Sequence, residues 1–156
     1  MKVQILQGVS GAGKSTYTQR TIDKYGASNV ECFSADNFFM VDNQYKFDRT
    51  KLSEAHAQCL RKYTMWLIHG AEDPNGSSNM LVIVDNTNTS VAEIAPYYQL
   101  AIAWGHEVEI IIFITDPQIA AHRNIHSVPE KTVISQWNRI NESWRNFPRY
   151  WKHQKI

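Results

Sequence analysis

The chain has 156 residues, the length of one domain that can bury a hydrophobic core, with 43% hydrophobic and 20% charged residues. Its net charge of +1 excludes a global field that would draw the chain to nucleic acid, so any basic surface must be local. No apolar run approaches the roughly 18 residues of a membrane span, and Cys32 and Cys59 lack metal-ligand spacing, so we expect a cytoplasmic domain with reduced cysteines and no membrane partner.

A strand is predicted at about 2–7, and a complete Walker A sequence, GVSGAGKS, follows it directly. Glycines allow a loop whose N–H groups point at phosphate oxygens, Lys14 supplies a charge to the β- and γ-phosphates, and Ser15 offers a hydroxyl to Mg²⁺. A helix predicted at about 14–25 adds its positive dipole end. The sequence therefore predicts a site for ATP, or another nucleoside triphosphate, with Mg²⁺. The residues expected to bind the nucleotide are Gly8, Ser10, Gly11, Ala12, Gly13, Lys14, Ser15 and Thr16.

Strands and helices are predicted to alternate along the rest of the chain. Strands are expected at about 29–34, 80–84 and 107–114, and a surface loop at 72–79. Helices are expected at about 50–70, after Ser90, from Asp116 and after Pro129, with Leu52 and Ile102 on the buried faces of the first two. This order predicts an α/β fold of the P-loop NTPase and kinase type. We expect a three-layer αβα sandwich with a parallel sheet of four to five strands, forming one domain over residues 1–156.

Carboxylates follow two of the predicted strands, at the sheet edge that the phosphate loop also occupies. Asp85 ends an apolar strand in the Walker B position, where it can hold Mg²⁺ directly or through water. Asp36 follows the second strand and can accept the proton of an attacking hydroxyl. Either aspartate alone could be a cap or a turn residue. Two of them beside a phosphate loop favour a catalytic function.

The segment at about 116–130 is predicted to act as a lid. A mobile arginine that closes over the γ-phosphate can stabilise the charge of phosphoryl transfer, and Arg123 or Arg139 could supply it. Alternatively, Arg123 is a solvated residue at a helix C-terminus. His126 could touch phosphate or substrate, or it could be polar surface.

Several further motifs follow Walker A: Ser34-x-Asp36, Tyr45-x-Phe47-Asp48, Ala55-His56, Asp85-Asn86-Thr87-Asn88-Thr89 and Arg123-Asn124-x-His126-x-Val128-Pro129. In this order and spacing, over about residues 1–140, they make the chain resemble the polynucleotide-kinase-like branch of P-loop kinases. That branch includes kinases of nucleic-acid 5′-hydroxyl ends and the phage 5-hydroxymethyluracil DNA kinases, which would act in the host cytoplasm. The resemblance implies Asp36 as general base, Lys14 and Ser15 at phosphate and Mg²⁺, Asp85 near metal or acceptor, and Arg123 as the lid arginine.

One departure from the family concerns the acceptor. Kinases that heal strand ends usually place a phosphate-gripping arginine three residues after the base aspartate, where this chain has Phe39. Phe38 and Phe39 could stack on a base or pack in the core. The favoured acceptor is therefore the 5-hydroxymethyl group of 5-hydroxymethyluracil in DNA. A polynucleotide 5′-kinase, a small-metabolite or nucleoside kinase, and a non-catalytic nucleotide switch remain as alternatives. Candidate substrate contacts are Phe38, Phe39, Asn88, His126 and Arg139.

The C-terminal stretch at about 137–156 interleaves aromatic residues with five basic residues against Glu142 alone. Such a stretch could bind DNA, because basic side chains neutralise phosphates and aromatic rings stack on exposed bases. It could instead be an amphipathic tail whose tryptophans cover the sheet. A second basic set, Lys46, Arg49 and Lys51, lies nearer to Asp36.

Overall fold

The computed structural model describes residues 1–42, 44–70, 80–125 and 127–156, so the predicted loop at 72–79 lies outside the described residues. The helices are α1 (Lys14–Tyr25), α2 (Leu52–Gly70), α3 (Val91–Ala103), α4 (Pro117–Arg123) and α5 (Glu130–Ser143). The strands are β1 (Lys2–Gln7), β2 (Val30–Phe33), β3 (Met40–Val41), β4 (Gln44–Tyr45), β5 (Leu81–Asp85), β6 (Glu107–Ile112) and β7 (His153–Lys155). None of the described helices is long and apolar enough to cross a membrane.

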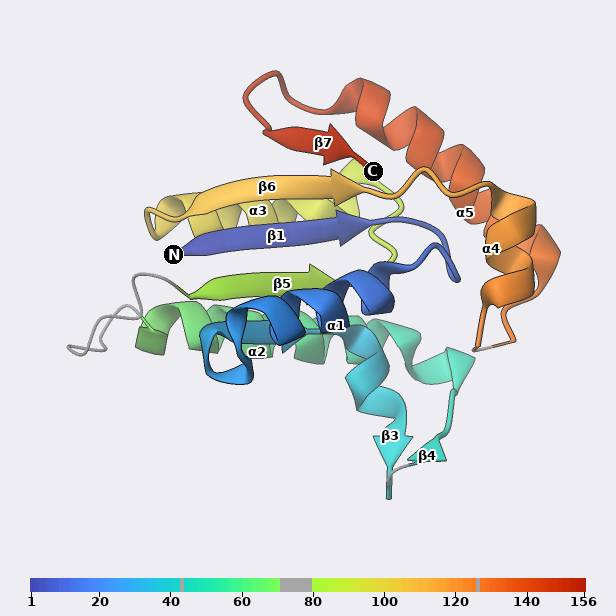
Figure 1. Cartoon of the computed structure of the whole chain (residues 1–156), viewed down its shortest axis with the longest axis horizontal. Helices are drawn as coiled ribbons and strands as arrows, with labels where there is room; N and C mark the ends of the chain where they lie inside the picture. The colour runs from blue at the N-terminus through green and yellow to red at the C-terminus, as the bar shows by residue number, and fades with distance from the viewer. Residues whose placement is uncertain (43, 71–79, 126) are drawn as a thin grey trace.

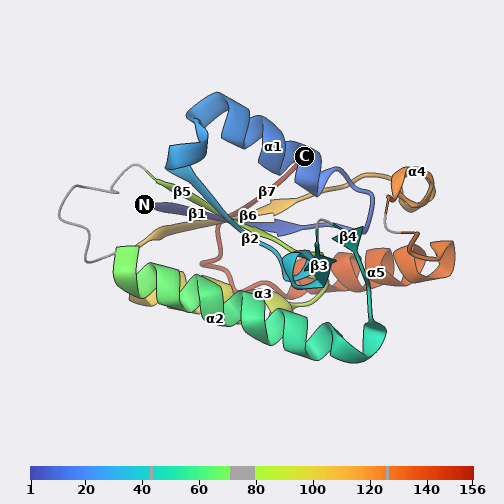
Figure 2. The same ribbon diagram turned by 90° about the horizontal axis from the view of Figure 1, so that it is seen from below.

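The main sheet is parallel and has five strands in the order β2-β5-β1-β6-β7. Helix α1 lies on one face of this sheet, and α2, α3 and α5 lie on the other (Figures 1 and 2). The predicted α/β class and layered sandwich are therefore confirmed. Because the strands are parallel, their carboxyl ends share one edge, and in Figure 1 the arrowheads point toward the end of the molecule that carries α4.

The central strands are apolar because both of their faces are covered. Val82, Ile83 and Val84 of β5 are fully buried, as are Ile110 and Ile111 of β6. Burial on two faces leaves no position for an exposed polar side chain, which explains why residues 81–84 of β5 and 110–112 of β6 are all apolar.

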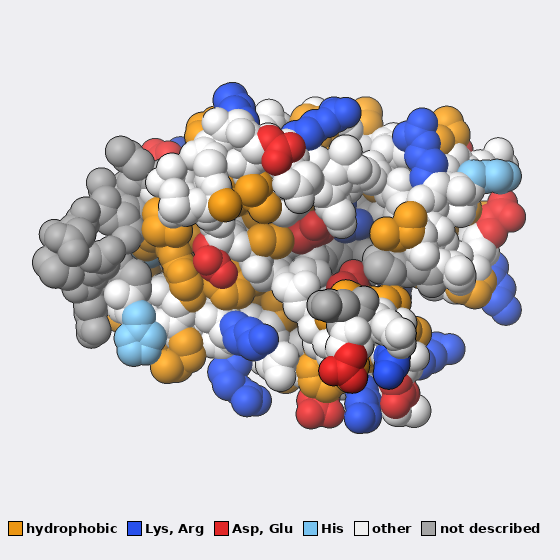
Figure 3. Space-filling model, turned by 60° about the horizontal axis from the view of Figure 1, so that its bottom comes forward, with side chains coloured by type: hydrophobic (Ala, Val, Ile, Leu, Met, Phe, Trp, Pro, Cys, Tyr) orange, Lys and Arg blue, Asp and Glu red, His pale blue; other side chains and the backbone are white. Residues whose placement is uncertain are grey.

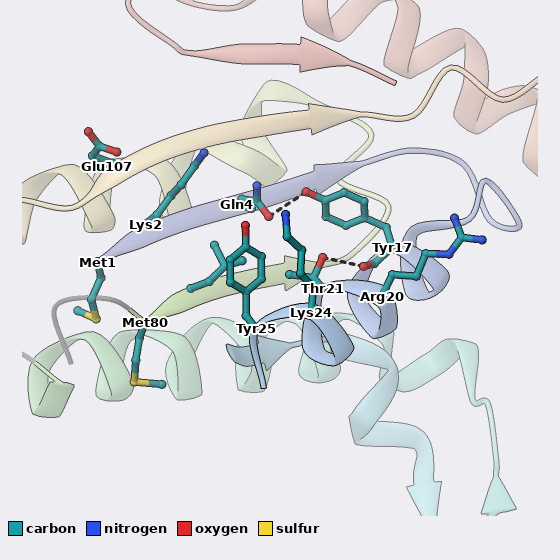
Figure 4. Close-up of a pocket in the computed structure, with 11 residues that line it drawn as sticks. Met1, Lys2, Gln4, Tyr17, Arg20, Thr21, Lys24, Tyr25, Met80 and Glu107 are labelled. Carbon is teal, nitrogen blue, oxygen red and sulfur yellow. Dashed lines mark hydrogen bonds between the residues drawn. The ribbon is translucent and has the colours of Figure 1, made fainter. Parts of the chain in front are cut away.

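Next to α1, the face of the sheet carries polar side chains from β1 and β6, including Lys2, Gln4 and Glu107, and is open to solvent there. A pocket of about 690 Å³ lies there, at the amino ends of the strands, and is shown in Figure 4. Lys2 forms an ion pair of 2.8 Å with Glu109, and the hydroxyl of Tyr17 donates to Gln4 at 3.0 Å. This pocket lies at the opposite end of the strands from the Walker A loop.

Strand β7 completes the sheet at an edge where no strand was predicted. It pairs in parallel with β6, with His153 opposite Ile110. Trp151, just before it, is 3% exposed and stacks on Tyr98 with the ring centroids 4.6 Å apart. Lys155 places its ammonium 3.3 Å from the ring centroid of Trp144. Much of the C-terminal stretch thus packs on the sheet, as the second of its two interpretations anticipated.

Two expected core residues are exposed instead. Leu52 is 40% exposed because it is the first residue of α2, whose buried face begins one turn later and comprises Ala55, Cys59, Tyr63 and Leu67. Ile102 is 48% exposed because α3 buries the stripe Ile94, Tyr97, Tyr98 and Ala101. The prediction for Leu52 was wrong because the residue lies at the end of its helix, and the prediction for Ile102 was wrong because packing decides the rotation of α3 about its axis.

Candidate functional site

The Walker A loop joins β1 to α1 at the carboxyl edge of the sheet. Gly11 and Gly13 have positive φ angles of 82° and 100°, a region that disfavours side chains. A Cβ on Gly11 would also lie 2.0 Å from the carbonyl oxygen of Ala120 in α4. The backbone of Ser10 donates to Oε1 of Gln136, from α5, at 2.9 Å. The loop is therefore held between the start of α1, helix α4 of the predicted lid, and helix α5, which follows the lid.

Lys14 is the buried cation of the site. Its side chain is 9% exposed, and Nζ donates to the carbonyl oxygens of Gly8 and Val9, each at 2.9 Å. Burial lowers the pKa of Lys14 to about 8, while the negative charges of Asp85 and Asp36 act in the opposite direction. The ammonium group therefore lies inside the loop and within electrostatic reach of both predicted carboxylates.

Asp85 ends β5 and is 8% exposed. Thr18, on α1, donates its hydroxyl to Oδ2 of Asp85 at 3.1 Å. Burial raises the pKa of Asp85, and the charge of Lys14 with hydrogen bonds from Thr18 and Ser15 lowers it. This carboxylate is thus fixed beside the first turn of α1 rather than acting as a cap or turn residue.

The oxygen donors of Ser15 and Asp85 fit Mg²⁺. Mg²⁺ in phosphate sites takes one or two protein oxygens and completes its shell with phosphate oxygens and water. Among the described residues there is no cluster of three or more His, Cys, Asp or Glu side chains that would make an all-protein metal site. When bound, Mg²⁺ would neutralise charge on the transferring phosphate.

Asp36 lies in a short helical turn, Ala35–Phe39, directly after β2. The carboxylate is exposed, and its Oδ1 accepts a hydrogen bond of 3.0 Å from the hydroxyl of Tyr45. Asn86, next to Asp85, accepts the backbone N–H of Ala35 at 2.8 Å and so ties the end of β5 to this turn. The negative charge of Asp36 acts on the pKa of Lys14 and of Asp85. The structure therefore brings all three charged groups to one edge of the sheet.

The lid arginines are exposed. Arg123 is the last residue of α4, and Arg139 lies on α5. After α4, the side chain of Asn124 donates to the carbonyl of Val128 at 2.8 Å and accepts its N–H at 3.2 Å, which closes the turn between the two helices. His126 lies outside the described residues.

The remaining candidate contacts divide by burial. Phe39 is 2% exposed and meets Phe38 edge to face at 5.3 Å, so it packs in the core, and Phe38 is half-buried. Asn88 is also 2% exposed. Its side-chain amide donates to the backbone carbonyl of Leu6 at 2.7 Å, and its backbone carbonyl accepts from Nε2 of Gln7 at 2.8 Å. Asn88, whose φ angle is 46°, thus links the loop after β5 to the end of β1.

Two contributors were missed from the sequence. Gln136 holds the Walker A backbone from 126 residues away, and no local signal distinguishes it from any other helical glutamine. Asn86 was present in the motif after β5, but its role as the link to the Asp36 turn depends on strand order.

Comparisons with known proteins identify the family and the fold of the chain. A family model described as an AAA domain matches residues 3–143. Human NEDD4-binding protein 2 is 30% identical over an alignment of 149 positions that covers 92% of this chain and 8% of that protein. The chain therefore spans a small part of the length of this relative.

Solved structures share the fold at low identity. A chain of the Pnkp1/Rnl/Hen1 RNA repair complex matches with a TM-score of 0.71 and 15% identity, covering 94% of this chain and 46% of that one. A gluconokinase from Sinorhizobium meliloti matches with a TM-score of 0.58 and 15% identity over 99% and 82%. The Mycobacterium tuberculosis APS kinase CysC matches with a TM-score of 0.58 and 15% identity over 99% and 87%.

The fold and the Walker A site define a nucleotide-binding P-loop domain of the kinase type. The chain belongs to the AAA-domain family whose model it matches. A chain of an RNA repair complex, a gluconokinase and an APS kinase all share this fold, so the fold alone does not identify the acceptor, which has to be argued from the site.

Proposed function

We propose that this domain is an ATP- and Mg²⁺-dependent kinase that transfers the γ-phosphate to a hydroxyl group on nucleic acid. The observation that carries the proposal is the position of Asp36. Its carboxylate is exposed and interacts electrostatically with Lys14 and Asp85. It lies at the carboxyl edge of the sheet, where the Walker A loop follows β1. A carboxylate placed between solvent and a phosphate loop can receive an incoming alcohol.

In the proposed reaction Asp36 accepts the proton of the acceptor hydroxyl. A bond forms between that oxygen and the γ-phosphorus, and the bond to the bridging oxygen of ADP breaks. Lys14 and the loop N–H groups stabilise the negative charge, and Ser15 with Asp85 would hold Mg²⁺. Arg123 approaches the γ-phosphate from the lid at about 116–130, and Arg139, on the following helix α5, is the second candidate for this role.

The first acceptor that we propose is the 5-hydroxymethyl group of 5-hydroxymethyluracil in DNA. Position 39, three residues after the general base, is a buried phenylalanine and cannot grip a strand-end phosphate. Because Phe39 is in the core, however, it cannot stack on a base either. The proposal of a base acceptor therefore depends on the absence of an arginine at position 39 and on other exposed aromatic rings near Asp36.

The second acceptor is the 5′-hydroxyl of a nucleic-acid strand, DNA or RNA. The observation in its favour is the exposed basic set Lys46, Arg49 and Lys51, which could hold the strand-end phosphate in place of the missing arginine. The fold similarity to a chain of an RNA repair complex is consistent with this acceptor.

Matched oligonucleotides test the proposal. The protein is incubated with γ-labelled ATP and one of three acceptors: DNA with internal 5-hydroxymethyluracil and a blocked 5′ end, unmodified DNA with a free 5′-hydroxyl, or RNA of the same sequence. Label on the internal base supports the first acceptor, and label at a 5′ end supports the second and rejects the first.

Two results would overturn the nucleic-acid proposal altogether. Transfer to a nucleoside or sugar but to no oligonucleotide would identify a small-metabolite kinase, a class that shares this fold. ATP binding without transfer to any acceptor would identify a nucleotide switch.

A further inference from the structure

A cluster of aromatic side chains surrounds the turn that carries Asp36. Phe39 lies at its centre, with the ring centroid of Tyr45 at 6.1 Å and that of Phe47 at 5.0 Å. The strand pair β3–β4 places Met40 opposite Tyr45, and the backbone of Lys46 donates to the carbonyl of Phe39 at 2.8 Å. The cluster is thus held by backbone hydrogen bonds as well as by ring contacts.

Phe47 is the exposed member of this cluster. Its side chain is 54% exposed although one edge packs on the buried ring of Phe39. The ring of Tyr45 lies nearly parallel to it, with an interplanar angle of 12° and a centroid separation of 6.4 Å. Phe47 therefore presents an aromatic surface to solvent in a fixed orientation, which lowers the entropy cost of stacking a ligand on it.

Tyr45 connects this aromatic surface to the proposed general base. Its hydroxyl donates to Oδ1 of Asp36 at 3.0 Å, while its ring lies alongside Phe47. Burial and the charge of Asp36 raise the pKa of Tyr45, so its hydroxyl keeps its proton at physiological pH. A group stacked on Phe47 would lie one side chain away from the carboxylate that receives the acceptor hydroxyl.

Basic residues accompany the ring in sequence and on the surface. Lys46, Arg49 and Lys51 are all exposed, and Figure 3 shows blue basic side chains together with red acidic and orange hydrophobic ones on the projection that carries β3 and β4. The nearest acidic neighbour, Asp48, caps the following turn by accepting the N–H of Thr50 at 2.9 Å and its hydroxyl at 2.6 Å. Asp36 and Asp42 are exposed on the same segment, so the three basic side chains give separate contacts for phosphates rather than a net positive surface.

We propose that Phe47 stacks on an unpaired nucleobase of the acceptor strand, next to the nucleotide whose hydroxyl reaches Asp36, while Lys46, Arg49 and Lys51 contact the flanking phosphates. This inference rests on the proposed function. It identifies the part of the acceptor strand that the domain recognises. A flat exposed ring accepts any base, so the subsite selects single-stranded nucleic acid rather than a sequence.

Steady-state kinetics of Phe47→Ala with an oligonucleotide acceptor tests the subsite. Stacking is worth about 1–3 kcal/mol per base, so we expect the KM for the oligonucleotide to rise about 5- to 100-fold while the KM for ATP is unchanged. Phe47→Trp restores the wild-type KM. Tyr25→Ala is the matched control, because Tyr25 is also exposed, at 51%, but lies at the far end of α1 from the Walker A loop.

A second acceptor separates stacking from a merely structural role of Phe47. An abasic nucleotide next to the reacting one lowers kcat/KM for the wild-type protein, and Phe47→Ala is nearly insensitive to this change if the ring stacks on that base. Equal losses for wild type and variant would overturn the subsite, as would an unchanged KM for the intact oligonucleotide. If the wild-type protein phosphorylates no oligonucleotide, the proposed function fails first, and the two failures are distinguishable.

Discussion

Two regions of this molecule are alike in sequence and different in structure. The segment 38–51 and the C-terminal stretch 137–156 both interleave aromatic with basic residues. In the first, Phe47 is exposed beside the turn of Asp36. In the second, Trp151 is buried against Tyr98, and two cations, Arg145 and Lys155, lie over the ring of Trp144.

The difference shows that basic and aromatic composition does not by itself identify a nucleic-acid surface. What distinguishes the two regions is their place relative to the sheet. The segment 38–51 follows the carboxyl end of β2 and therefore faces the ligand edge, whereas the C-terminal stretch supplies the edge strand β7 and the residues that cover it. Position relative to strand ends is thus the better guide to function.

The largest expected effect concerns stability. Trp151→Ala removes a buried ring, so we expect the free energy of unfolding to fall by about 3–5 kcal/mol in urea denaturation. Phe47→Ala, at an exposed position, should cost only about 1 kcal/mol. For the KM of the oligonucleotide acceptor we expect the opposite order, with a larger change for Phe47→Ala than for Trp151→Ala. The comparison breaks down if Trp151→Ala weakens oligonucleotide binding without destabilising the fold.

The next prediction uses the lowered pKa of Lys14, which is about 8. As pH rises above this value the free protein loses the charge that attracts the triphosphate, so ATP affinity should fall by up to about tenfold per pH unit. Titration calorimetry between pH 7 and 9 measures the effect, and Lys14→Met should show weak binding at both pH values. A flat profile for the wild-type protein would contradict the assigned environment of Lys14.

Without nucleotide, the stability of the fold is expected to change with pH in the direction opposite to ATP affinity. The pKa of Lys14 is 10.5 when unperturbed and lower in the folded state, so between about pH 8 and 10.5 the unfolded chain binds the extra proton. The contribution of Lys14 therefore makes the nucleotide-free fold more stable as pH rises through this window. Lys14→Met removes that rise.

The smallest effects come from surface charge. Replacing Arg49 and Lys51 by Gln should raise the oligonucleotide KM several-fold at low salt and reduce its salt dependence, because phosphate contacts release counterions. The same replacement of Arg145 and Arg149, also exposed, should leave the KM within about twofold. Equal effects of the two pairs would show that both regions contact the strand.

The sequence predicted those parts of the site that depend on local rules. The Walker A loop follows a strand, and Asp36 and Asp85 follow two more, so the parallel sheet alone brings them to one edge. The parallel sheet and its helical layers follow from the alternation of strand and helix together with apolar strands, whereas the order of the strands was not predicted.

Other features depend on contacts between distant segments. Strand β7 has no apolar run and forms because β6 offers it an open edge, and β3 and β4 have two residues each, too few to show a period. The rotation of α3 about its axis, which exposes Ile102, and the reach of Gln136 to Ser10 are decided by packing. Such features carry no signal in a single sequence.

The role of Asp36 is tested most directly by single-turnover phosphoryl transfer with Asp36→Asn. This variant keeps the shape of the side chain and removes the base, so we expect the transfer rate to fall about 10²- to 10⁴-fold while ATP affinity stays unchanged. Asp42→Asn is the control, since Asp42 is also exposed and follows directly after β3. Transfer at the wild-type rate by Asp36→Asn would contradict the account.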